Sequence, residues 1–110
     1  PRDSMIEIDT IISAFDAAAY NKKPKTFTMP NRGPRYNSCE LCGSFDEWQV
    51  KHEMSFDPFT NQWFVTQHCK PGVDFFYKYV INGEQWVVND DEDNRDDGSG
   101  NVNNFGHIPI

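Results

Sequence analysis

An aromatic residue and a cation in one short stretch have the spacing of a sugar-binding surface. Residues 75–86 read FFYKYVINGEQW, a β-type run that is interrupted by Asn82 and Gly83. Asn-Gly between β-type runs predicts a hairpin, because a type I′ turn requires positive φ at both central residues. After such a turn, Trp86 can return beside Lys78. A flat ring next to a hydrogen-bond donor suits a sugar, whereas a core tryptophan beside a snorkelling lysine is the alternative interpretation.

Strand periodicity decides which side chains share a surface with this lysine. Neighbouring side chains of a strand point to opposite faces of the sheet. The two predicted faces are Tyr77, Tyr79 and Ile81 on one side, and Phe76, Lys78 and Val80 on the other. A long cation on the second face indicates that this face is not wholly buried.

Cys39 and Cys42 form a Cys-x-x-Cys pair, a spacing that suits a zinc site or a redox site. Their odd separation on one strand, however, predicts that the two thiols point to opposite faces. No second pair of this kind and no His-x-x-His sequence follows. We therefore expect Cys39 to be a small buried hydrophobe, unpaired and without a metal.

Residues 89–101 form an acidic, polar stretch that invites a comparison with calcium-binding loops. If Gly98 took the central glycine position of an EF-hand, Arg95 would occupy a ligand position. Asn104 would then replace the bidentate glutamate that closes such a loop. These residues exclude an EF-hand, leave a weak irregular calcium site open, and favour a solvated loop.

The sequence carries no recognisable catalytic machinery. Its three histidines fall in separate runs, and it lacks a nucleophile elbow, a P-loop and a dinucleotide-binding fingerprint. No two acids are paired in the way that glycoside hydrolysis requires. We therefore expect a domain that is not an enzyme and that requires no cofactor.

Size and charge narrow the classes of partner. At 110 residues the chain is long enough for one domain with a single core. A net charge of −7 argues against nucleic acids and anionic membranes, which need basic surfaces. No apolar run approaches the roughly 20 residues that span a bilayer. An odd number of cysteines favours a reducing compartment, so we expect the cytoplasm, with a plastid as the alternative in a plant or an alga.

An amphipathic helix is predicted near the N-terminus, over residues 3–20. Its apolar residues recur at spacings of three and four. This apolar stripe consists of Met5, Ile8, Ile12, Phe15 and Ala19. The stripe would pack either on the domain itself or on a protein partner. Residues 1–23 are accordingly predicted to be a helix with its linker.

From residue 24 onward the pattern is typical of an antiparallel β-sandwich. Prolines and glycines in residues 21–35 argue against a long element there and leave room for a short edge strand at Thr26–Met29. Further strands are expected near residues 36–42, 48–54, 62–69, 74–81, 85–88 and 102–108. Short strands separated by turns predict a small all-β sandwich domain over residues 24–110.

Three short motifs carry a resemblance to a known family. GSFDEW at 43–48 is followed by YKYVINGEQW at 77–86 and GNVNN at 100–104. In order and spacing they resemble carbohydrate-binding module family forty-eight, in particular the glycogen-binding domain of the AMP-activated protein kinase beta subunit. The resemblance covers roughly residues 24–108. It implies an early-set, immunoglobulin-like sandwich that binds α-glucans such as glycogen or starch without catalysis.

The resemblance also implies a role for each residue that matches the family pattern. Trp48 and Trp86 would stack on sugar rings. Lys78 and Asn103 would hydrogen-bond the hydroxyl groups of the glucan. No metal enters this site, so the expected ligand is the sugar alone.

Two positions depart from the family pattern. Asn101 stands where the family has a threonine, and it can still donate and accept hydrogen bonds. Ser99 stands where the family has a leucine that reaches the glucan, so apolar contact is lost there. The expected function is glucan binding that localises a larger protein or complex. The alternative is a protein-interaction module of the same fold that docks through its N-terminal helix and binds glucan weakly or not at all.

Overall fold

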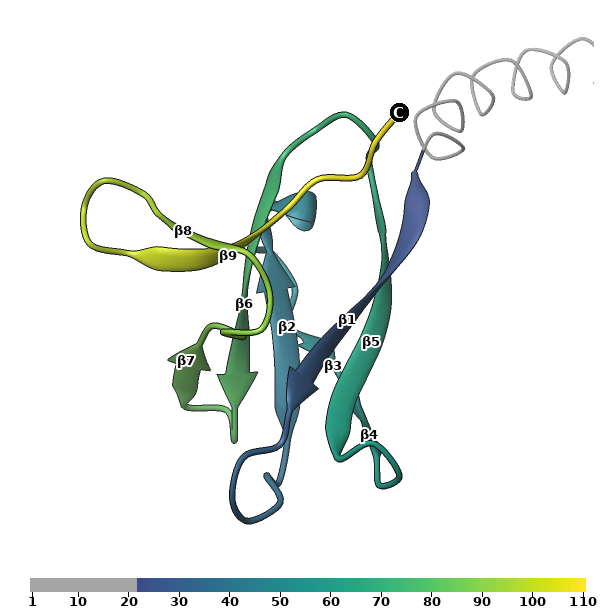
Figure 1. Ribbon diagram of the computed structural model, residues 1–110, viewed down its shortest axis with the longest axis vertical. Helices are drawn as coiled ribbons and strands as arrows, with labels where there is room; N and C mark the ends of the chain where they lie inside the picture. The colour runs from purple at the N-terminus through teal and green to yellow at the C-terminus, as the bar shows by residue number, and fades with distance from the viewer. Residues whose placement is uncertain (1–21) are drawn as a thin grey trace, which may run out of the picture.

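The computed structural model describes residues 22–110, whose arrangement is shown in Figure 1. The strands are β1 (Lys23–Pro30), β2 (Cys39–Gly43), β3 (His52–Glu53), β4 (Ser55–Asp57), β5 (Gln62–Cys69), β6 (Phe75–Ile81), β7 (Gln85–Val87), β8 (Asn94–Asp96) and β9 (Val102–Gly106). One turn of 3-10 helix, η1 (Ser44–Asp46), follows β2. No helix among residues 22–110 is long and apolar enough to cross a membrane. The helix predicted at 3–20, with Met5, Ile8, Ile12 and Phe15, lies outside the described residues.

Two antiparallel sheets make up the described fold. The smaller sheet has the order β1-β5-β4. The larger has the order β3-β2-β6-β9-β8, with β7 paired to the second half of β6. Side chains of both sheets meet in one buried cluster. The predicted all-β antiparallel fold is therefore confirmed, and the immunoglobulin-like assignment remains what the resemblance implies.

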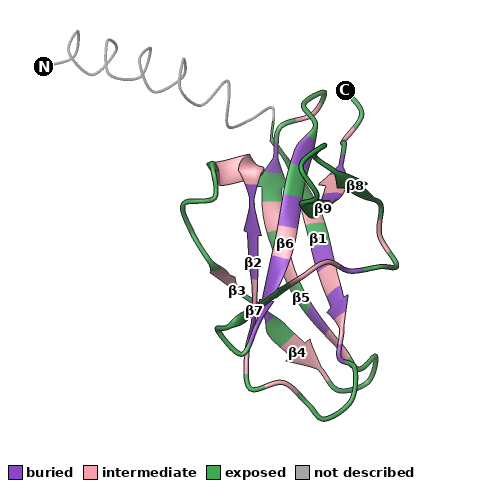
Figure 2. Ribbon diagram, turned by 90° about the vertical axis from the view of Figure 1, so that its left-hand side faces the viewer, coloured by how far each residue is buried: buried purple, intermediate pink, exposed green. Residues whose placement is uncertain are grey.

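The alternation predicted for β6 organises this core, and Figure 2 shows buried and less buried residues along that strand. Its inner face consists of the buried Tyr77, Tyr79 and Ile81. The ring of Phe27, from the opposite sheet, lies edge-on to Tyr77 with 4.8 Å between the ring centres. On the outer face Phe76 and Lys78 are partly exposed, whereas Val80 is buried.

The turn between β6 and β7 has the predicted geometry. Asn82 and Gly83 have φ angles of +55° and +71°, so both lie in the left-handed region that a type I′ turn uses. The N–H of Glu84 donates to the carbonyl of Ile81 across the turn (3.1 Å). The side chain of Asn82 also accepts the N–H of Asn37 (2.7 Å), which ties the hairpin to the segment before β2.

β1 corrects the prediction that residues 21–35 hold only a short edge strand. The strand runs over eight residues and pairs with β5 along its whole length. Pro24 and Pro30 are tolerated because β1 lies at the edge of its sheet, where a missing N–H on the free side breaks no pair. The predicted edge position is thus confirmed, and the predicted length is wrong.

The strand predicted at 48–54 is reduced to β3 near its end, and a further strand, β4, follows just beyond it in the other sheet. β3 pairs with β2 in the larger sheet, and β4 pairs with β5 in the smaller one. Met54 lies between them with its side chain buried, and its N–H donates to the carbonyl of Cys39 (2.9 Å). The chain therefore passes from the edge of one sheet to the edge of the other within one residue, which no apolar alternation along a single strand can indicate.

β8 lies inside residues 89–101, the stretch predicted to be a solvated loop. All three of its residues are exposed, so no apolar side chain marks the strand in the sequence. It forms because its backbone pairs with β9, with Arg95 opposite Asn103. The side chain of Asp96 accepts the N–H of Gly98 (2.7 Å) and so helps to close the turn between the two strands.

Candidate functional site

Strand alternation places Lys78 and Asn103 on the outer face of the larger sheet, the face that also carries Val80. Lys78 pairs with Cys42 of β2. The ladder between β6 and β9 ends at the pair of Tyr77 and Asn104, and Lys78 and Asn103 each lie one residue beyond this last pair. Neighbouring side chains of a strand point to opposite faces, so Lys78 and Asn103 both point away from the face that carries Tyr77 and Asn104. Two of the predicted hydrogen-bonding residues therefore share the outer face.

Trp86 shares this outer face. In the pairing of β6 with β7 it lies opposite Val80, whose side chain points to the same side as that of Lys78. Val80 is fully buried, whereas Trp86 is 48% exposed. The indole thus lies against the sheet with part of its surface open to solvent.

Trp48 lies in the loop between η1 and β3, which Figure 2 shows as exposed. The residue itself is 41% exposed. Its backbone has a φ of +63°, and its N–H donates to the carbonyl of Gly43 at the end of β2 (2.8 Å). Both predicted stacking residues are exposed. A common platform formed by Trp48, Trp86 and Lys78 remains a prediction.

The two asparagines of the predicted site lie in and just before β9. Asn103 is half-buried in the strand, and Asn101 is exposed in the preceding turn. The carbonyl of Asn101 accepts the N–H of Asp97 (2.9 Å), and its own N–H donates to Asp97 Oδ1 (3.3 Å). The N–H of Ser99, with a further contribution from Asn101, lowers the pKa of the Asp97 carboxyl. An ionised carboxylate therefore holds the turn beside the outer face.

Sequence reasoning missed two cations near the predicted residues. Lys51 directly precedes β3, and its Nζ lies 5.6 Å from the centre of the Trp86 ring. Arg95 lies opposite Asn103, and its guanidinium carbon is 3.6 Å from the centre of the Phe105 ring. Neither cation belongs to a motif in the sequence, because one lies in a loop and the other in an acidic stretch. Pairing of β8 with β9 brings Arg95 to the outer face, and the loop before β3 brings Lys51 to the Trp86 ring.

Cys39 and Cys42 point to opposite faces of β2, as their spacing predicts. Cys39 lies opposite Ile81 on the core side, and Cys42 lies opposite Lys78 on the outer side. Both are buried free thiols. Burial raises the pKa of Cys39 to about 12, and the charge of Glu40 adds to the effect. Within residues 22–110, no three His, Cys, Asp or Glu side chains are grouped so that they could hold a metal ion.

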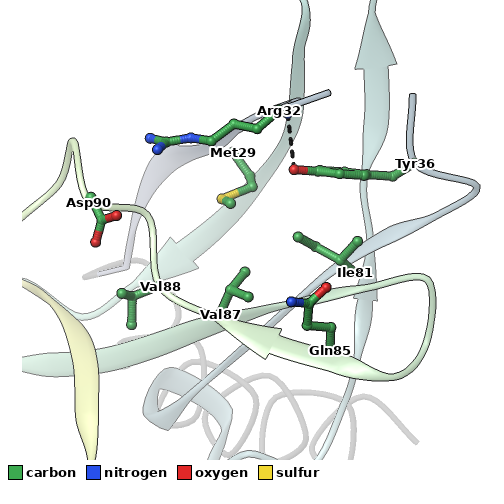
Figure 3. Close-up of a pocket in the computed structure, with 8 residues that line it drawn as sticks. All are labelled: Met29, Arg32, Tyr36, Ile81, Gln85, Val87, Val88 and Asp90. Carbon is green, nitrogen blue, oxygen red and sulfur yellow. Dashed lines mark hydrogen bonds between the residues drawn. The ribbon is translucent and has the colours of Figure 1, made fainter. Parts of the chain in front are cut away.

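A cavity of about 540 Å³ lies on the inner side of β7, away from the face that carries Trp86. Figure 3 shows the apolar side chains of Met29, Ile81 and Val87 around it. The full lining consists of Met29, Arg32, Tyr36, Ile81, Gln85, Val87, Val88 and Asp90. No residue of the predicted site belongs to this lining. This cavity is therefore separate from the candidate site.

The outer face offers the groups that sugar binding requires. A pyranose ring has an apolar side of C–H groups, which an exposed indole covers. Its hydroxyl groups lie at the rim, where amide and ammonium groups hydrogen-bond them. Because these hydroxyls are neutral, the net charge of −7 does not oppose binding.

Comparison with known proteins points to the same ligand class. Residues 24–109 match a family described as the glycogen recognition site of AMP-activated protein kinase. An amyloplastic phosphoglucan phosphatase of Castanea sativa is 28% identical to this chain over 108 residues. That similarity covers 94% of this chain but only 28% of the phosphatase, so the chain spans little more than a quarter of this relative.

The family match bears on the two interpretations of the sequence. It confirms the resemblance that the three motifs carry, and a glycogen recognition site is a binding module. Neither comparison supports the alternative, a protein-interaction module that binds little or no glucan. Since the match extends over most of the chain, this protein belongs to the family of glycogen recognition domains of AMP-activated protein kinase.

Proposed function

We propose that the outer face of the larger sheet binds α-glucan chains such as glycogen or starch, without catalysing a reaction. The observation that carries the proposal is the sheet register. Lys78 and Asn103 each lie one residue beyond the last pair between β6 and β9, and strand alternation puts their side chains on the face that also carries the exposed Trp86. Membership of a glycogen recognition family supports the same class of ligand.

Each residue of the proposed site has a distinct role. The indoles of Trp48 and Trp86 stack on glucose rings, and such aromatic contacts contribute on the order of 0.5–1.5 kcal/mol beyond the area that they bury. Lys78 and Asn103 hydrogen-bond hydroxyl groups between the rings. Asn101 assists from the turn before β9, where its side chain is exposed.

The turn between β8 and β9 sets a limit on the affinity. At Ser99 the resemblance implies a leucine, and the serine is exposed. Replacing a buried aliphatic contact with a hydroxymethyl group removes about 1–2 kcal/mol of apolar burial. The site therefore keeps its stacking and hydrogen-bonding residues but loses one apolar contact.

In its parent protein the domain would localise a larger glucan-active protein on its substrate. The similarity to the phosphoglucan phosphatase covers 94% of this chain. The family match covers a smaller part of the chain, residues 24–109. The shared sequence therefore extends upstream into residues 1–23. This favours a phosphatase-like parent over a free-standing binding domain. The protein would be found where its glucan is stored, which is the cytoplasm for glycogen or a plastid for starch.

Co-sedimentation tests the proposed ligand. The 110-residue chain should pellet with glycogen and with amylopectin, and soluble maltoheptaose should release it. Cellulose, a β-linked glucan, is the matched control and should leave the chain in the supernatant. A chain that pellets with neither α-glucan, or equally with cellulose, would overturn the proposal.

A further inference from the structure

The loop between η1 and β3 carries Trp48 and Lys51 on an unusual backbone. Glu47 and Trp48 have φ angles of +60° and +63°. Residues other than glycine seldom adopt positive φ, and such conformations persist only where surrounding contacts hold them. Main-chain hydrogen bonds supply some of these contacts: Trp48 donates to the carbonyl of Gly43 (2.8 Å), and Glu47 donates to that of Ser44 (3.1 Å).

A side-chain pair closes the same loop. Asp46 is the last residue of η1 and His52 is the first of β3, so they flank the segment 47–51. His52 Nε2 lies 2.6 Å from Asp46 Oδ2. A carboxylate can only accept a hydrogen bond, so the imidazole N–H donates. Both side chains are largely covered, with exposures of 19% for His52 and 27% for Asp46.

The pair is attached to the core through Phe45. The Phe45 ring packs so closely over Gly43 that a Cβ there would lie 2.2 Å from it. The centre of the same ring is 5.6 Å from that of Phe27 and 5.8 Å from that of His52. Among the described residues, Asp46 Oδ1 is buried without a hydrogen-bond partner. Loss of the histidine would therefore remove the one hydrogen bond that this carboxylate makes to another described side chain, which is unfavourable.

We propose that Asp46 and His52 are positioning residues of the glucan site. Their contact fixes the loop, so that Trp48 and Lys51 are held in place before the glucan arrives. This inference rests on the proposed function. A preorganised loop avoids the entropy that ordering would cost on binding. Without the pair, the two positive-φ residues relax and the indole of Trp48 leaves its bound orientation.

Two substitutions at one position test the proposal. His52→Ala removes the donor, whereas His52→Gln places an amide N–H at a similar reach. We expect the alanine variant to bind maltoheptaose about tenfold more weakly, and the glutamine variant to stay within about twofold of the wild type. His68→Ala is the matched control, because His68 is exposed on β5 in the other sheet. The affinity of this variant for maltoheptaose should equal that of the wild type.

The indole N–H resonance of Trp48 provides a second readout that does not depend on glucan. It should shift in His52→Ala and return towards its wild-type position in His52→Gln, while the resonance of the buried Trp63 stays in place. An unshifted Trp48 resonance, or wild-type affinity in the alanine variant, overturns the proposal. If the wild type binds no glucan, the proposed function fails, and the Trp48 resonance alone decides whether the pair positions the loop.

Discussion

Lys78 is expected to contribute less to glucan binding than either indole. Its partners in the proposed site are neutral hydroxyl groups, and such a hydrogen bond contributes only about 0.5–1.5 kcal/mol net. Lys78→Ala should therefore weaken maltoheptaose binding by roughly two- to twelvefold in isothermal titration calorimetry. Because the ligand carries no charge, the affinity should also depend little on salt.

Lys70→Ala is the matched control for this substitution. Lys70 is an exposed lysine that follows β5, outside the proposed site, and its loss should leave the affinity unchanged. Complete loss of binding in Lys78→Ala would contradict the expectation that Lys78 contributes less than either indole. So would an affinity that falls steeply with salt, since that would indicate an anionic ligand.

Residue types and short motifs were enough to suggest the candidate site, because indoles and polar groups at set spacings are visible in a sequence. Lys78, Trp86 and Asn103 do share one face. Lys51 and Arg95 could not be predicted, because their places depend on which strands become neighbours. Contacts of that kind follow from tertiary pairing and leave no mark on the periodicity of either segment.

A substitution in the turn between β8 and β9 should raise the affinity for glucan. Ser99→Leu would restore the aliphatic side chain that the resemblance implies at this exposed position. If that side chain packs against bound glucan, it should tighten binding by about 1–2 kcal/mol. That gain corresponds to roughly five- to thirtyfold in the dissociation constant for maltoheptaose.

A leucine can also raise affinity through non-specific adhesion, so Ser55→Leu is the appropriate comparison. Ser55 is exposed on β4 of the smaller sheet, away from the outer face. It should show no gain. Equal gains in both variants, or none in Ser99→Leu, would mean that the turn does not contact the glucan.

Among the strands and turns, apolar alternation predicted which side chains of a strand are buried, and the turn residues predicted where a hairpin forms. The hairpin at Asn82 and Gly83 and the two faces of β6 follow from local rules and are confirmed. β8 could not be predicted, because its exposed residues pair only through their backbone. The crossing at Met54 and the full length of β1 likewise depend on a partner strand.

The core of the whole domain should make its stability sensitive to alkaline pH. Burial raises the pKa values of Tyr77 and Tyr79 above their ordinary 10.0, and the charge of Glu92 adds to both effects. Burial likewise raises that of Cys39 from 9.0 to about 12. The folded chain thus keeps protons that the unfolded chain releases once the pH passes these ordinary values. Stability that is fully present below about pH 9 should therefore be lost as the pH rises further.

Urea unfolding measures this loss directly. The midpoint should stay level up to about pH 8–9 and then fall steadily towards about pH 11, as the unfolded thiol and phenols ionise. Tyr79→Phe, which removes one of these phenols, should flatten the fall. A midpoint that is unchanged over the same range would show that the buried groups do not hold their protons as described.

The central claim is that exposed indoles on the outer face bind glucan, and calorimetry of Trp86→Ala against Phe59→Ala tests it most directly. Phe59 is 98% exposed between β4 and β5, so its loss removes an exposed aromatic ring elsewhere on the molecule. Loss of stacking and buried area at Trp86 should cost about 2–3 kcal/mol. Maltoheptaose should therefore bind Trp86→Ala roughly thirtyfold or more weakly and Phe59→Ala like the wild type. Equal affinities for the two variants, or no saturable binding by the wild type at millimolar maltoheptaose, would contradict the claim.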